Sequence, residues 1–560
     1  MAFSARQRPA LLERLASEPF DVLVVGGGVT GAGVARDAAL RGLRVALVDK
    51  GDFSGGTSSR SSKLIHGGLR YLEQGDVGLV FEAVRERQRL MKLAPHLARP
   101  LSFVVPVFRG SKRGVFVLDI GLTIYDTLAA FTGVIRHRAL RSGRLLEMEP
   151  CLRREGLRGG VEYFDAQTND ARLVLANLRG ANEAGAVCVS RVELDTPDFE
   201  SGRLTAVRLR DRISGKLFKT RTHSVILAAG PWTDIAKQRW YDREAAPMMR
   251  PSKGVHIVIP RERMPLEHAV VMTAADGRVV FALPWPDATV LGTTDTAFEG
   301  PLEDPQVYES DCRYLLETAN THLVARGGAL EISDVVSTWA GIRPLAIGTR
   351  DDGAASGTYQ TSREHVVQVD PRGLVTIAGG KLTTYRLMAD EAIEAMCPLL
   401  PPNRLEGLRR SVTEHLPLPG ADRLPARGEP LEAMAELLVR DHGATGRYAR
   451  YLVSHYGSDA DRILDLCRRT PAGLEPVIPG RALLWGEVRW VVEEEMPLDL
   501  VDIAVRRLPL YYLAGDAVLD VADDLAERVC AWCGYPVERA AELVAGLRAH
   551  VEHSRPVAGM

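Results

Sequence analysis

The sequence feature that most constrains the fold is a strand, a glycine turn, a helix, a second strand and an acid in direct succession. The apolar run 21–25 leads into the glycine-rich turn 26–31, after which small apolar residues recur at helical spacing up to Gly42. A second apolar run, 45–48, ends at Asp49. Because the glycines stand between a strand and a helix, the pattern predicts a dinucleotide-binding βαβ unit.

Each position of this unit has an expected task. Gly26 permits a tight turn, Gly28 lets the backbone approach a pyrophosphate, and Gly31 lets the helix lie close on the strand. The N–H groups at the N-terminus of the helix attract the phosphates. Asp49 stands where a carboxylate accepts hydrogen bonds from an adenosine ribose, which disfavours a 2′-phosphate. The pattern alone does not separate FAD from NAD.

The residues after Asp49 favour FAD. Residues 55–63 are a dense run of glycine and hydroxyl side chains, which suits a long polar ligand that continues past the first ribose. Taken alone, this run is equally a flexible glycine and serine loop. It is followed at once by Leu64-Ile65 and by His66-Gly67-Gly68-Leu69-Arg70-Tyr71, which is not the composition of a linker.

The run from Thr57 to Leu72, Thr-Ser-Ser-Arg-Ser-Ser-Lys-Leu-Ile-His-Gly-Gly-Leu-Arg-Tyr-Leu, resembles the signature of the FAD-dependent glycerol-3-phosphate dehydrogenases. The resemblance is dense over roughly residues 20–400 and looser to about residue 545. It implies FAD as cofactor and an α/β fold: a glutathione-reductase-type, Rossmann-like FAD-binding domain, an antiparallel-sheet substrate domain and an all-α C-terminal domain. Relatives often carry Glu where this chain has Asp49, and the shorter carboxylate still serves.

A chain of 560 residues is too long for one core, so we expect several domains. We predict a discontinuous FAD-binding domain over 18–100, 150–240 and 345–400. Residues 101–149 and 241–344 would form the substrate domain, with a possible membrane contact, and residues 401–560 a helical C-terminal domain. The runs between 251 and 341 indicate a mostly antiparallel sheet, covered by a helix near 304–325. Helices of the last domain are expected at 431–442, 447–456, 482–495, 500–507 and 537–553.

Three further segments repeat the nucleotide-binding pattern. A helix ending near Glu183 is expected to be capped by aspartates among residues 165–170. A strand over 185–192 and a hairpin around 214–215 follow, and the buried strand from 225 ends in a small-residue turn. The strand from 374 meets two glycines and then a helix, with Thr383 or Thr384 as its expected N-cap. Its positive end would favour negative charge on a reduced flavin.

These patterns and the resemblance together give the expected cofactor contacts. They are Gly26, Gly27, Gly28, Gly31, Asp49, Thr57, Ser58, Ser61, Ser62, Lys63, Leu64, His66, Val192, Gly230, Gly380, Lys381, Leu382 and Thr383.

Four basic side chains in four separate family motifs are the expected catalytic residues. A dianionic phosphate ester needs a cationic receptor, and the arginine fork matches phosphate oxygens in pairs. The resemblance places sn-glycerol 3-phosphate among His256, Arg343, Arg70 and Lys381. His256 would take the C2 hydroxyl proton. Arg343 and Arg70 would hold phosphate or polarise the developing ketone, with Lys381 adding positive charge. Taken singly, each is as easily a solvated charge or a salt-bridge partner.

Composition and charge limit the partners, the metal sites and the compartment that we expect for this chain. With 70 basic and 72 acidic residues the net charge is −2, so no nucleic acid is expected. Seven scattered cysteines suit a reducing compartment, and Cys530-Ala-Trp-Cys533 is interpreted as helix packing, with no metal site. Charged residues interrupt every apolar run among the first twenty residues, so no signal peptide is expected. No calcium-binding loop occurs after residue 401. A homodimer is compatible with the sequence.

The longest apolar run, 115–134, contains Asp119 and Asp126. Each acid would cost about 2.5–3.5 kcal/mol near a bilayer centre, so the run is not expected to span. Basic residues flank it on both sides, which suits a helix lying in a membrane interface. A buried helix with a solvated basic end is the equal alternative. The expected location is cytoplasmic, peripherally associated with the inner face of the cell membrane.

Of two candidate electron acceptors, a membrane quinone is preferred and oxygen is the alternative. A membrane quinone fits the basic and apolar segment, and oxygen would make the protein a glycerophosphate oxidase that produces H2O2. A flavoenzyme acting on an amino acid or another carboxylate is a further alternative. A nucleotide-binding regulator without turnover belongs to a different class, and it predicts bound FAD that no substrate reduces.

Overall fold

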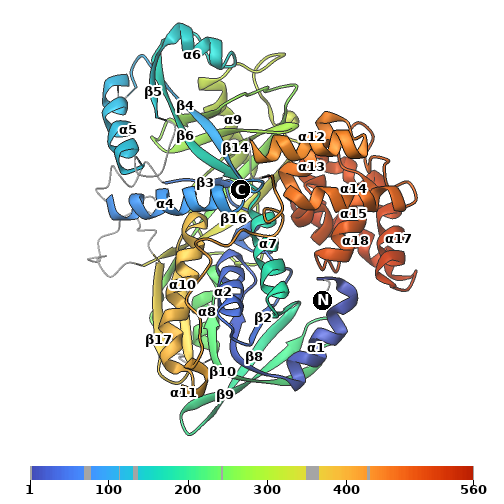
Figure 1. The fold of residues 1–560 in the computed structure, drawn as a ribbon. Coiled ribbons are helices and arrows are strands. Elements are labelled where there is room, and N and C mark those ends of the chain that lie inside the picture. Colours follow the sequence, from blue (N-terminus) through green and yellow to red (C-terminus); the bar gives the residue numbers. More distant parts are fainter. Residues whose placement is uncertain are drawn as a thin grey trace.

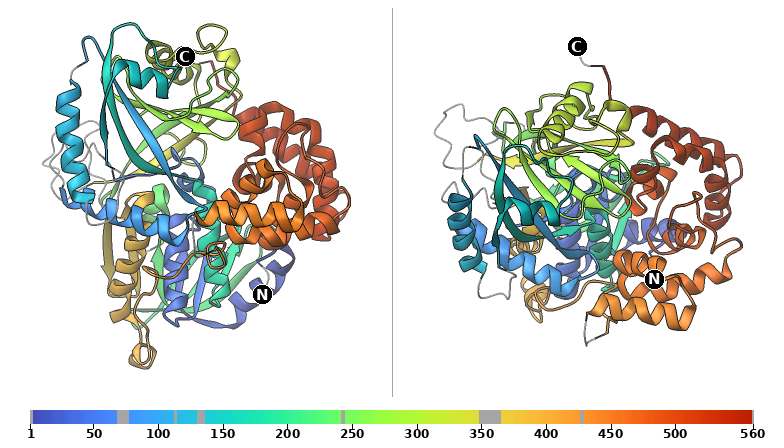
Figure 2. Two further views of the ribbon diagram at one scale, coloured as in Figure 1. Left: turned by 45° about the horizontal axis from the view of Figure 1, so that its top comes forward. Right: turned by 90° about the horizontal axis from the view of Figure 1, so that it is seen from above.

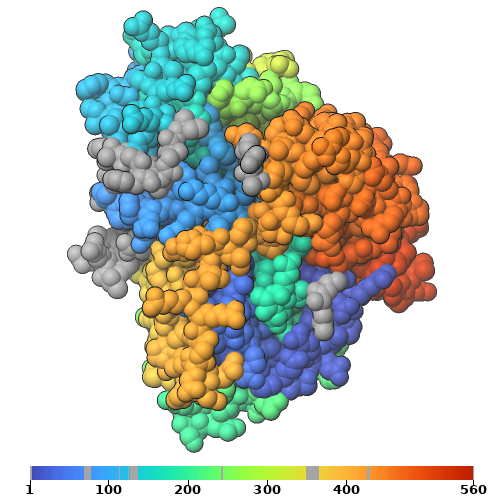
Figure 3. All heavy atoms as spheres, viewed as in Figure 1, coloured from blue at the N-terminus to red at the C-terminus, as the bar shows by residue number. Residues whose placement is uncertain are grey.

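The computed structural model describes residues 3–67, 77–111, 114–129, 136–240, 244–347, 365–425 and 429–558. Two sheets lie one above the other in Figure 1, and the helices of the last third of the chain cover one flank of both. The space-filling view shows these C-terminal residues packed against both sheet regions (Figure 3). The predicted α/β architecture with an all-α C-terminal domain is thereby confirmed.

The first sheet carries the nucleotide-binding pattern. Its strand order is β17-β18-β10-β1-β2-β7, with β8 and β9 continuing from β10. Pairing is parallel among β7, β2, β1, β10 and β18. It is antiparallel between β17 and β18 and along β8, β9 and β10. The strands are β1 (Pro19–Val25), β2 (Val45–Asp49), β7 (Val187–Ser190), β8 (Val192–Glu200), β9 (Arg203–Asp211), β10 (Leu217–Leu227), β17 (His365–Asp370) and β18 (Leu374–Gly379).

Helices α2 (Val29–Leu40), α7 (Asp170–Glu183) and α10 (Tyr385–Met396) pack on this sheet side by side (Figure 1). The sequence misjudged local details here. The second strand of the hairpin expected around 214–215 and the strand expected from 225 are one continuous strand, β10. The expected strand 185–192 breaks at Arg191, whose φ is +57°. The N-cap of α7 is Asn169, which accepts from the Arg172 N–H, so the predicted aspartate cap is wrong. The N-cap residue of α10 is Thr384, one of the two predicted, although its side chain makes no capping hydrogen bond.

The second sheet has the order β15-β11-β14-β13-β12-β4-β6-β3, with β16 on β11 and β5 on β6. It is antiparallel throughout except between β12 and β4, as the sequence predicted. Helix α9 (Glu309–His322) packs on it, and α6 (Ser142–Met148) lies beside β5 and β6. The strands are β3 (Leu64–Ile65), β4 (Ala98–Phe108), β5 (Arg138–Arg141), β6 (Leu157–Thr168), β11 (Met249–Pro260), β12 (Ala269–Thr273), β13 (Val279–Trp285), β14 (Ala288–Gly292), β15 (Thr296–Ala297) and β16 (Ser337–Ala346).

The C-terminal domain is helical, as predicted, but α14 (Ala460–Arg469), α16 (Leu510–Ala514) and α17 (Ala522–Cys533) lie outside the predicted helix ranges. The predicted helix 500–507 is in part a π-helical turn, η10 (Asp502–Arg507). Cys530 and Cys533 are buried in α17 as free thiols. The other helices are α12 (Pro430–His442), α13 (Gly446–Tyr456), α15 (Trp485–Glu494) and α18 (Arg539–His553).

Two helices lie on the flank opposite the C-terminal domain (Figure 2). They are α4 (Val77–Leu93) and α5 (Val115–Ala129), and they pack against each other. Asp119 and Asp126 of α5 both contact the imidazole of His137, at 3.1 and 2.7 Å. Within the described ranges no helix is long and apolar enough to cross a bilayer.

Candidate active site

A cavity of about 740 Å³ lies between the two sheets. One wall consists of residues at the carboxyl ends of β1, β2, β10 and β18, where ligands of open α/β sheets bind. The opposite wall comes from β11 and β16 of the second sheet. The predicted residues that line it are Gly26, Gly28, Asp49, Thr57, Ser58, Ser61, Ser62, Leu64, His66, Val192, Gly230, His256, Arg343, Gly380, Lys381, Leu382 and Thr383.

Four predicted site residues are not among the described lining residues. Gly27, Gly31 and Lys63 lie outside the described lining, and Arg70 falls outside the described residues. Gly31 is nevertheless required by packing, because a Cβ there would overlap the carbonyl oxygen of Gly26. Gly26 has φ +111°, and a Cβ on it would overlap the Ala228 carbonyl. The glycine turn is therefore closed backbone to backbone.

Asp49 and Ser58 order the glycine turn. The Asp49 carboxylate accepts from the backbone N–H of Gly27 at 2.6 Å and of Gly51 at 2.7 Å. Burial raises the pKa of this carboxyl group, and the two N–H donors oppose the rise. Ser58 Oγ accepts from the N–H of Val29, the first residue of α2, at 3.0 Å. The serine run thus contacts the positive end of that helix.

Lys63 and Asp170 hold the serine run in place from outside the described cavity lining. The Lys63 ammonium group donates to Asp170 Oδ1 at 2.5 Å and to the Ser59 carbonyl at 3.1 Å. Ser61 Oγ donates to the other oxygen of Asp170 at 2.7 Å. Asp170 is fully buried and opens α7. It was expected only as a helix cap, and no local pattern reveals its bonds to residues 107 and 109 positions earlier.

His256 lies in the middle of β11, facing the cavity. Its Nε2 is 2.8 Å from Ser62 Oγ, and its ring stacks on Trp339 of the neighbouring strand with centroids 4.9 Å apart. Burial lowers the pKa of this imidazole well below 6.5, and the charges of Arg343 and Lys63 act in the same direction. The imidazole is therefore neutral near pH 7 and able to accept a proton.

Arg343 is held on β16 by a ring of acceptors. Its guanidinium donates to Thr293 Oγ1 at 2.8 Å and to the Thr294 carbonyl at 2.9 Å, and Asp295 lies 3.3 Å away. A Cβ on Gly254 would overlap the guanidinium, so glycine leaves room for it on the facing strand. Because β11 and β16 pair in fixed register, His256 and Arg343 keep a constant spacing along the cavity.

Lys381 and Thr383 stand between β18 and α10. Both line the cavity, and the Thr383 hydroxyl bridges the backbone N–H and carbonyl of His66 at 3.2 and 3.1 Å. This bridge joins two segments that the sequence analysis treated separately. The described lining also contains charged or aromatic residues that the sequence analysis did not assign: Lys50, Asp52, Arg60, Glu193, Arg212, Trp232, Arg239, Trp240, Glu303 and Arg506.

Comparisons with known proteins agree on one group. A model described as FAD dependent oxidoreductase matches residues 21–386, and one described as the C-terminal domain of alpha-glycerophosphate oxidase matches residues 411–540. A glycerol-3-phosphate dehydrogenase of Mycobacterium leprae is 38% identical over 96% of this chain and 89% of its own length. An alpha-glycerophosphate oxidase of Streptococcus pyogenes is 34% identical over 90% of each chain.

A solved structure spans the whole chain. The Bacillus halodurans glycerol-3-phosphate dehydrogenase, complexed with FAD, superposes with a TM-score of 0.80 at 29% identity, covering all of both chains.

Proposed function

Because the chain belongs to the FAD-dependent glycerol-3-phosphate dehydrogenase family, we propose that it oxidises sn-glycerol 3-phosphate to dihydroxyacetone phosphate and delivers the electrons to a membrane quinone. The observation that carries the proposal is one cavity in which a nucleotide-binding glycine turn faces His256, Arg343 and Lys381. A cationic cavity wall suits a phosphate ester, and a buried neutral imidazole suits removal of a hydroxyl proton.

The cavity fits FAD. The turn at Gly26 leaves no room for a side chain, so the backbone lines the cavity where a diphosphate would approach α2. Thr57, Ser58, Ser61 and Ser62 continue the polar lining toward His256. When bound, FAD supplies the hydride acceptor of the reaction, and Lys381 and the residues after β18 would lie beside it.

His256 is the proposed general base for the C2 hydroxyl group. Ser62 Oγ occupies the imidazole Nε2, so a substrate hydroxyl reaches that nitrogen either by turning the Ser62 side chain away or by passing its proton through the serine hydroxyl. Trp339 fixes the plane of the ring by stacking. The structure supports a base that needs no prior deprotonation near neutral pH.

Arg343 is the proposed receptor for phosphate or for the oxygen that becomes the ketone. Its guanidinium lines the cavity, and the arginine fork matches the oxygens of a phosphate group in pairs. Lys381 lines the same cavity and adds positive charge to it. Arg70 remains a predicted partner in the same role.

Membrane contact is supported by an apolar surface on α4 and α5, here called the α4–α5 face. Phe116 is 74% exposed, and the other exposed large apolar side chains of the two helices are Val77, Phe81, Val117 and Ile120. Both acids of α5, Asp119 and Asp126, contact the imidazole of His137. A peripheral contact here would bring the protein to a quinone dissolved in the bilayer.

Anaerobic mixing of the FAD-loaded protein with glycerol 3-phosphate tests the reaction. We expect bleaching of the flavin absorbance by glycerol 3-phosphate and not by glycine or glycerol. Bleaching by glycine would favour an amino-acid substrate, and no bleaching at all would favour a regulator without turnover.

The second candidate is a glycerophosphate oxidase, supported by the similarity to the streptococcal oxidase over 90% of this chain. Turnover with a quinone in liposomes, compared with peroxide formed under air, separates the two acceptors. One peroxide per substrate in the absence of quinone would select the oxidase.

A further inference from the structure

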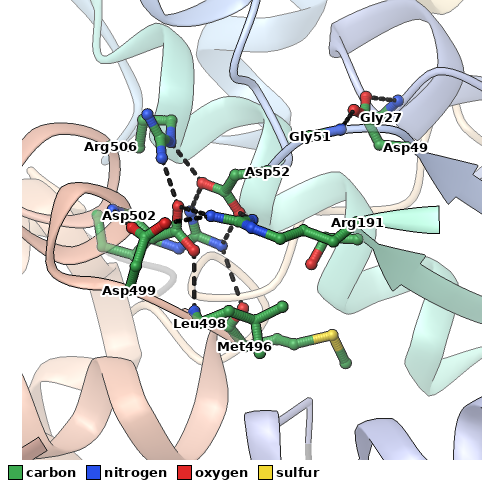
Figure 4. A network of polar contacts seen from close by, with 12 residues as sticks. Gly27, Asp49, Gly51, Asp52, Arg191, Met496, Leu498, Asp499, Asp502 and Arg506 are labelled. Atoms are coloured by element: carbon green, nitrogen blue, oxygen red, sulfur yellow. Dashed lines mark hydrogen bonds and ion pairs between the residues drawn. The ribbon is translucent and has the colours of Figure 1, made fainter. Parts of the chain in front are cut away.

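Six buried or half-buried charges join the C-terminal domain to the loop that follows Asp49 (Figure 4). Three are carboxylates, on Asp52, Asp499 and Asp502, and three are guanidinium groups, on Arg191, Arg506 and Arg507. The charges balance within the network. Loss of any one member therefore leaves an uncompensated charge in a low-dielectric setting.

Asp52 is the end of this network that reaches the cofactor site. It is 5% exposed and lies in loop 50–56, between Asp49 and the turn η2 (Thr57–Ser59). Its carboxylate accepts from Arg507 Nη2 at 2.8 Å, from Arg507 Nη1 and from Arg506 Nε. Both arginines come from a stretch of chain more than 450 residues later.

The two arginines are fixed at their own end. They close the π-helical turn η10, whose wide spacing is seen in the Leu508 N–H bond to the Ile503 carbonyl at 2.9 Å. Such turns are frequent at functional sites. Arg507 also donates to the carbonyls of Glu495 and Met496, at 3.1 and 3.4 Å, while Arg506 pairs with Asp502.

Arg191 completes the network from the other side of the loop. Its guanidinium contacts Asp499 at 2.5 Å and Asp502 at 2.8 Å, and its backbone N–H donates to the Gly51 carbonyl at 2.8 Å. Burial and the charge of Asp502 raise the pKa of Asp499, while the arginines hold the pKa of Asp502 well below its usual range. Loop 50–56 is thus held by the ionic contacts of Asp52 and by the backbone hydrogen bond between Arg191 and Gly51.

The same loop orders the nucleotide turn. The Ser54 N–H donates to the Gly27 carbonyl at 3.0 Å, and the Gly51 N–H donates to Asp49. Arg506 itself lines the cavity, and among the described lining residues it alone follows residue 400. A shift of Asp52 would therefore move both the acid expected at the ribose and the backbone expected at the diphosphate.

We propose that Arg506 and Arg507 are positioning residues, through which the C-terminal domain sets the affinity of the site for FAD. They act on the cofactor by way of Asp52 and loop 50–56. The proposal rests on FAD as the cofactor but not on the substrate. Apparent affinity falls with the fraction of molecules in which the loop is correctly held, so loosening the network weakens binding. The coupling is reciprocal, so bound FAD in turn stabilises η10.

Release of FAD from the purified holoprotein tests the proposal. The variant is Asp52→Asn, which keeps the shape of the side chain and removes its charge. The matched control is Asp459→Asn, because Asp459 and Arg179 form a buried pair at 2.9 Å that also joins the C-terminal helices to α7 but lies outside the described cavity lining. The measured quantities are the rate of rise of free-flavin fluorescence after dilution and the midpoint of thermal unfolding.

We expect release to accelerate about tenfold or more in Asp52→Asn, since affinity changes appear mostly in the dissociation rate. Asp459→Asn should lower the unfolding midpoint while its release rate stays within about twofold of the parent. Equal acceleration in both variants, or none in Asp52→Asn, would overturn the proposal.

If Asp52→Asn does not fold, Arg507→Lys and Arg507→Met take its place. The lysine variant should retain FAD better than the methionine variant, and equal release would overturn the proposal. Because the coupling is reciprocal, bound FAD should also slow amide hydrogen exchange in residues 498–508. These readouts need no substrate, so they are separate from the bleaching experiment that tests the proposed reaction.

Discussion

The imidazole Nε2 of His256 lies 2.8 Å from the hydroxyl oxygen of Ser62, so the predicted base and the serine-rich run meet directly. The two residues are 194 positions apart, one on β11 and one in the segment after η2. In the proposed mechanism, this hydroxyl group stands at the imidazole nitrogen that would take the substrate proton. Substitutions at His256 and at Ser62 therefore test separate parts of the proposed proton transfer.

His256→Asn should lower the rate of flavin reduction by glycerol 3-phosphate about 10²- to 10⁴-fold, because a general base is lost. Anaerobic stopped-flow absorbance measures that rate, and flavin content should stay near the parent value. Ser62→Ala resolves how the proton travels. A relay through the hydroxyl predicts slower reduction in Ser62→Ala, and displacement of the side chain predicts an unchanged or faster rate. Normal reduction by His256→Asn would remove histidine from the mechanism.

The pH dependence of reduction should reflect the buried setting of His256. Burial, with Arg343 and Lys63, lowers its pKa well below 6.5. The neutral, active form therefore persists as the pH falls, so the rate should stay level from about pH 8 through 6.5 and decline only below that. Stopped-flow profiles on the parent protein give the acid limb. A limb centred at or above 6.5 would contradict the assignment.

Gly254→Ala should disturb Arg343 without touching its charge. The added Cβ would overlap the guanidinium, and displacement of a substrate-holding group by about 1 Å costs on the order of 10²-fold in rate. Steady-state kinetics should show the loss in kcat/KM. Gly143→Ala in α6 is the control, since no atom lies within 4 Å of its Cβ and activity should be unchanged. An active Gly254→Ala enzyme would speak against a role for Arg343.

The α4–α5 face should carry the affinity for membranes. Burying one large apolar side chain is worth about 1.5–3 kcal/mol, so the double change Phe116→Ser and Ile120→Ser should weaken liposome binding by about tenfold or more. Co-sedimentation with anionic liposomes measures it. Val537→Ser alters a side chain that is 78% exposed in the C-terminal domain, and it should leave binding intact. Equal binding by all three proteins would exclude this face as the contact.

Folding stability should fall on acidification because of buried histidines. Burial lowers the pKa of His96, His455 and His550 to about 3, against 6.5 for an ordinary histidine. The unfolded chain binds protons at these positions first, so their contribution is complete above 6.5 and is lost as the pH falls toward 3. Urea unfolding at pH 7.5 and 5 measures it, and His550→Gln should reduce the difference. An equal free energy of unfolding at pH 7.5 and at pH 5 would contradict this prediction.

Local patterns predicted the parts of the site that local chemistry dictates. Gly26 and Gly31 are required by close backbone contacts around the glycine turn. The alternating runs after residue 251 indicate strands by their local periodicity, and these strands form the antiparallel sheet. Where competing local signals were close in strength the prediction failed. Asn169 caps α7 although aspartates stand on both sides of it in the chain, because Asp170 instead pairs with Lys63.

Contacts between distant segments could not be predicted from one sequence. Nothing in the composition around Arg506 indicates that it reaches Asp52, and Lys63 carries no local sign that it turns away from the cavity toward Asp170. Such pairings depend on how whole layers dock, and neither spacing nor periodicity carries that information.

The stacking of His256 on Trp339 extends into the last third of the chain, since Tyr512 lies 5.0 Å from the same indole. Trp339, Tyr512 and Trp485 belong to one continuous apolar core that spans the second sheet and the C-terminal helices. A protein shortened at residue 401 would therefore open the wall behind its own base to water. A minimal flavin-binding half of this protein should therefore be insoluble when it is produced alone. Reduction of the flavin by substrate should require the C-terminal helices.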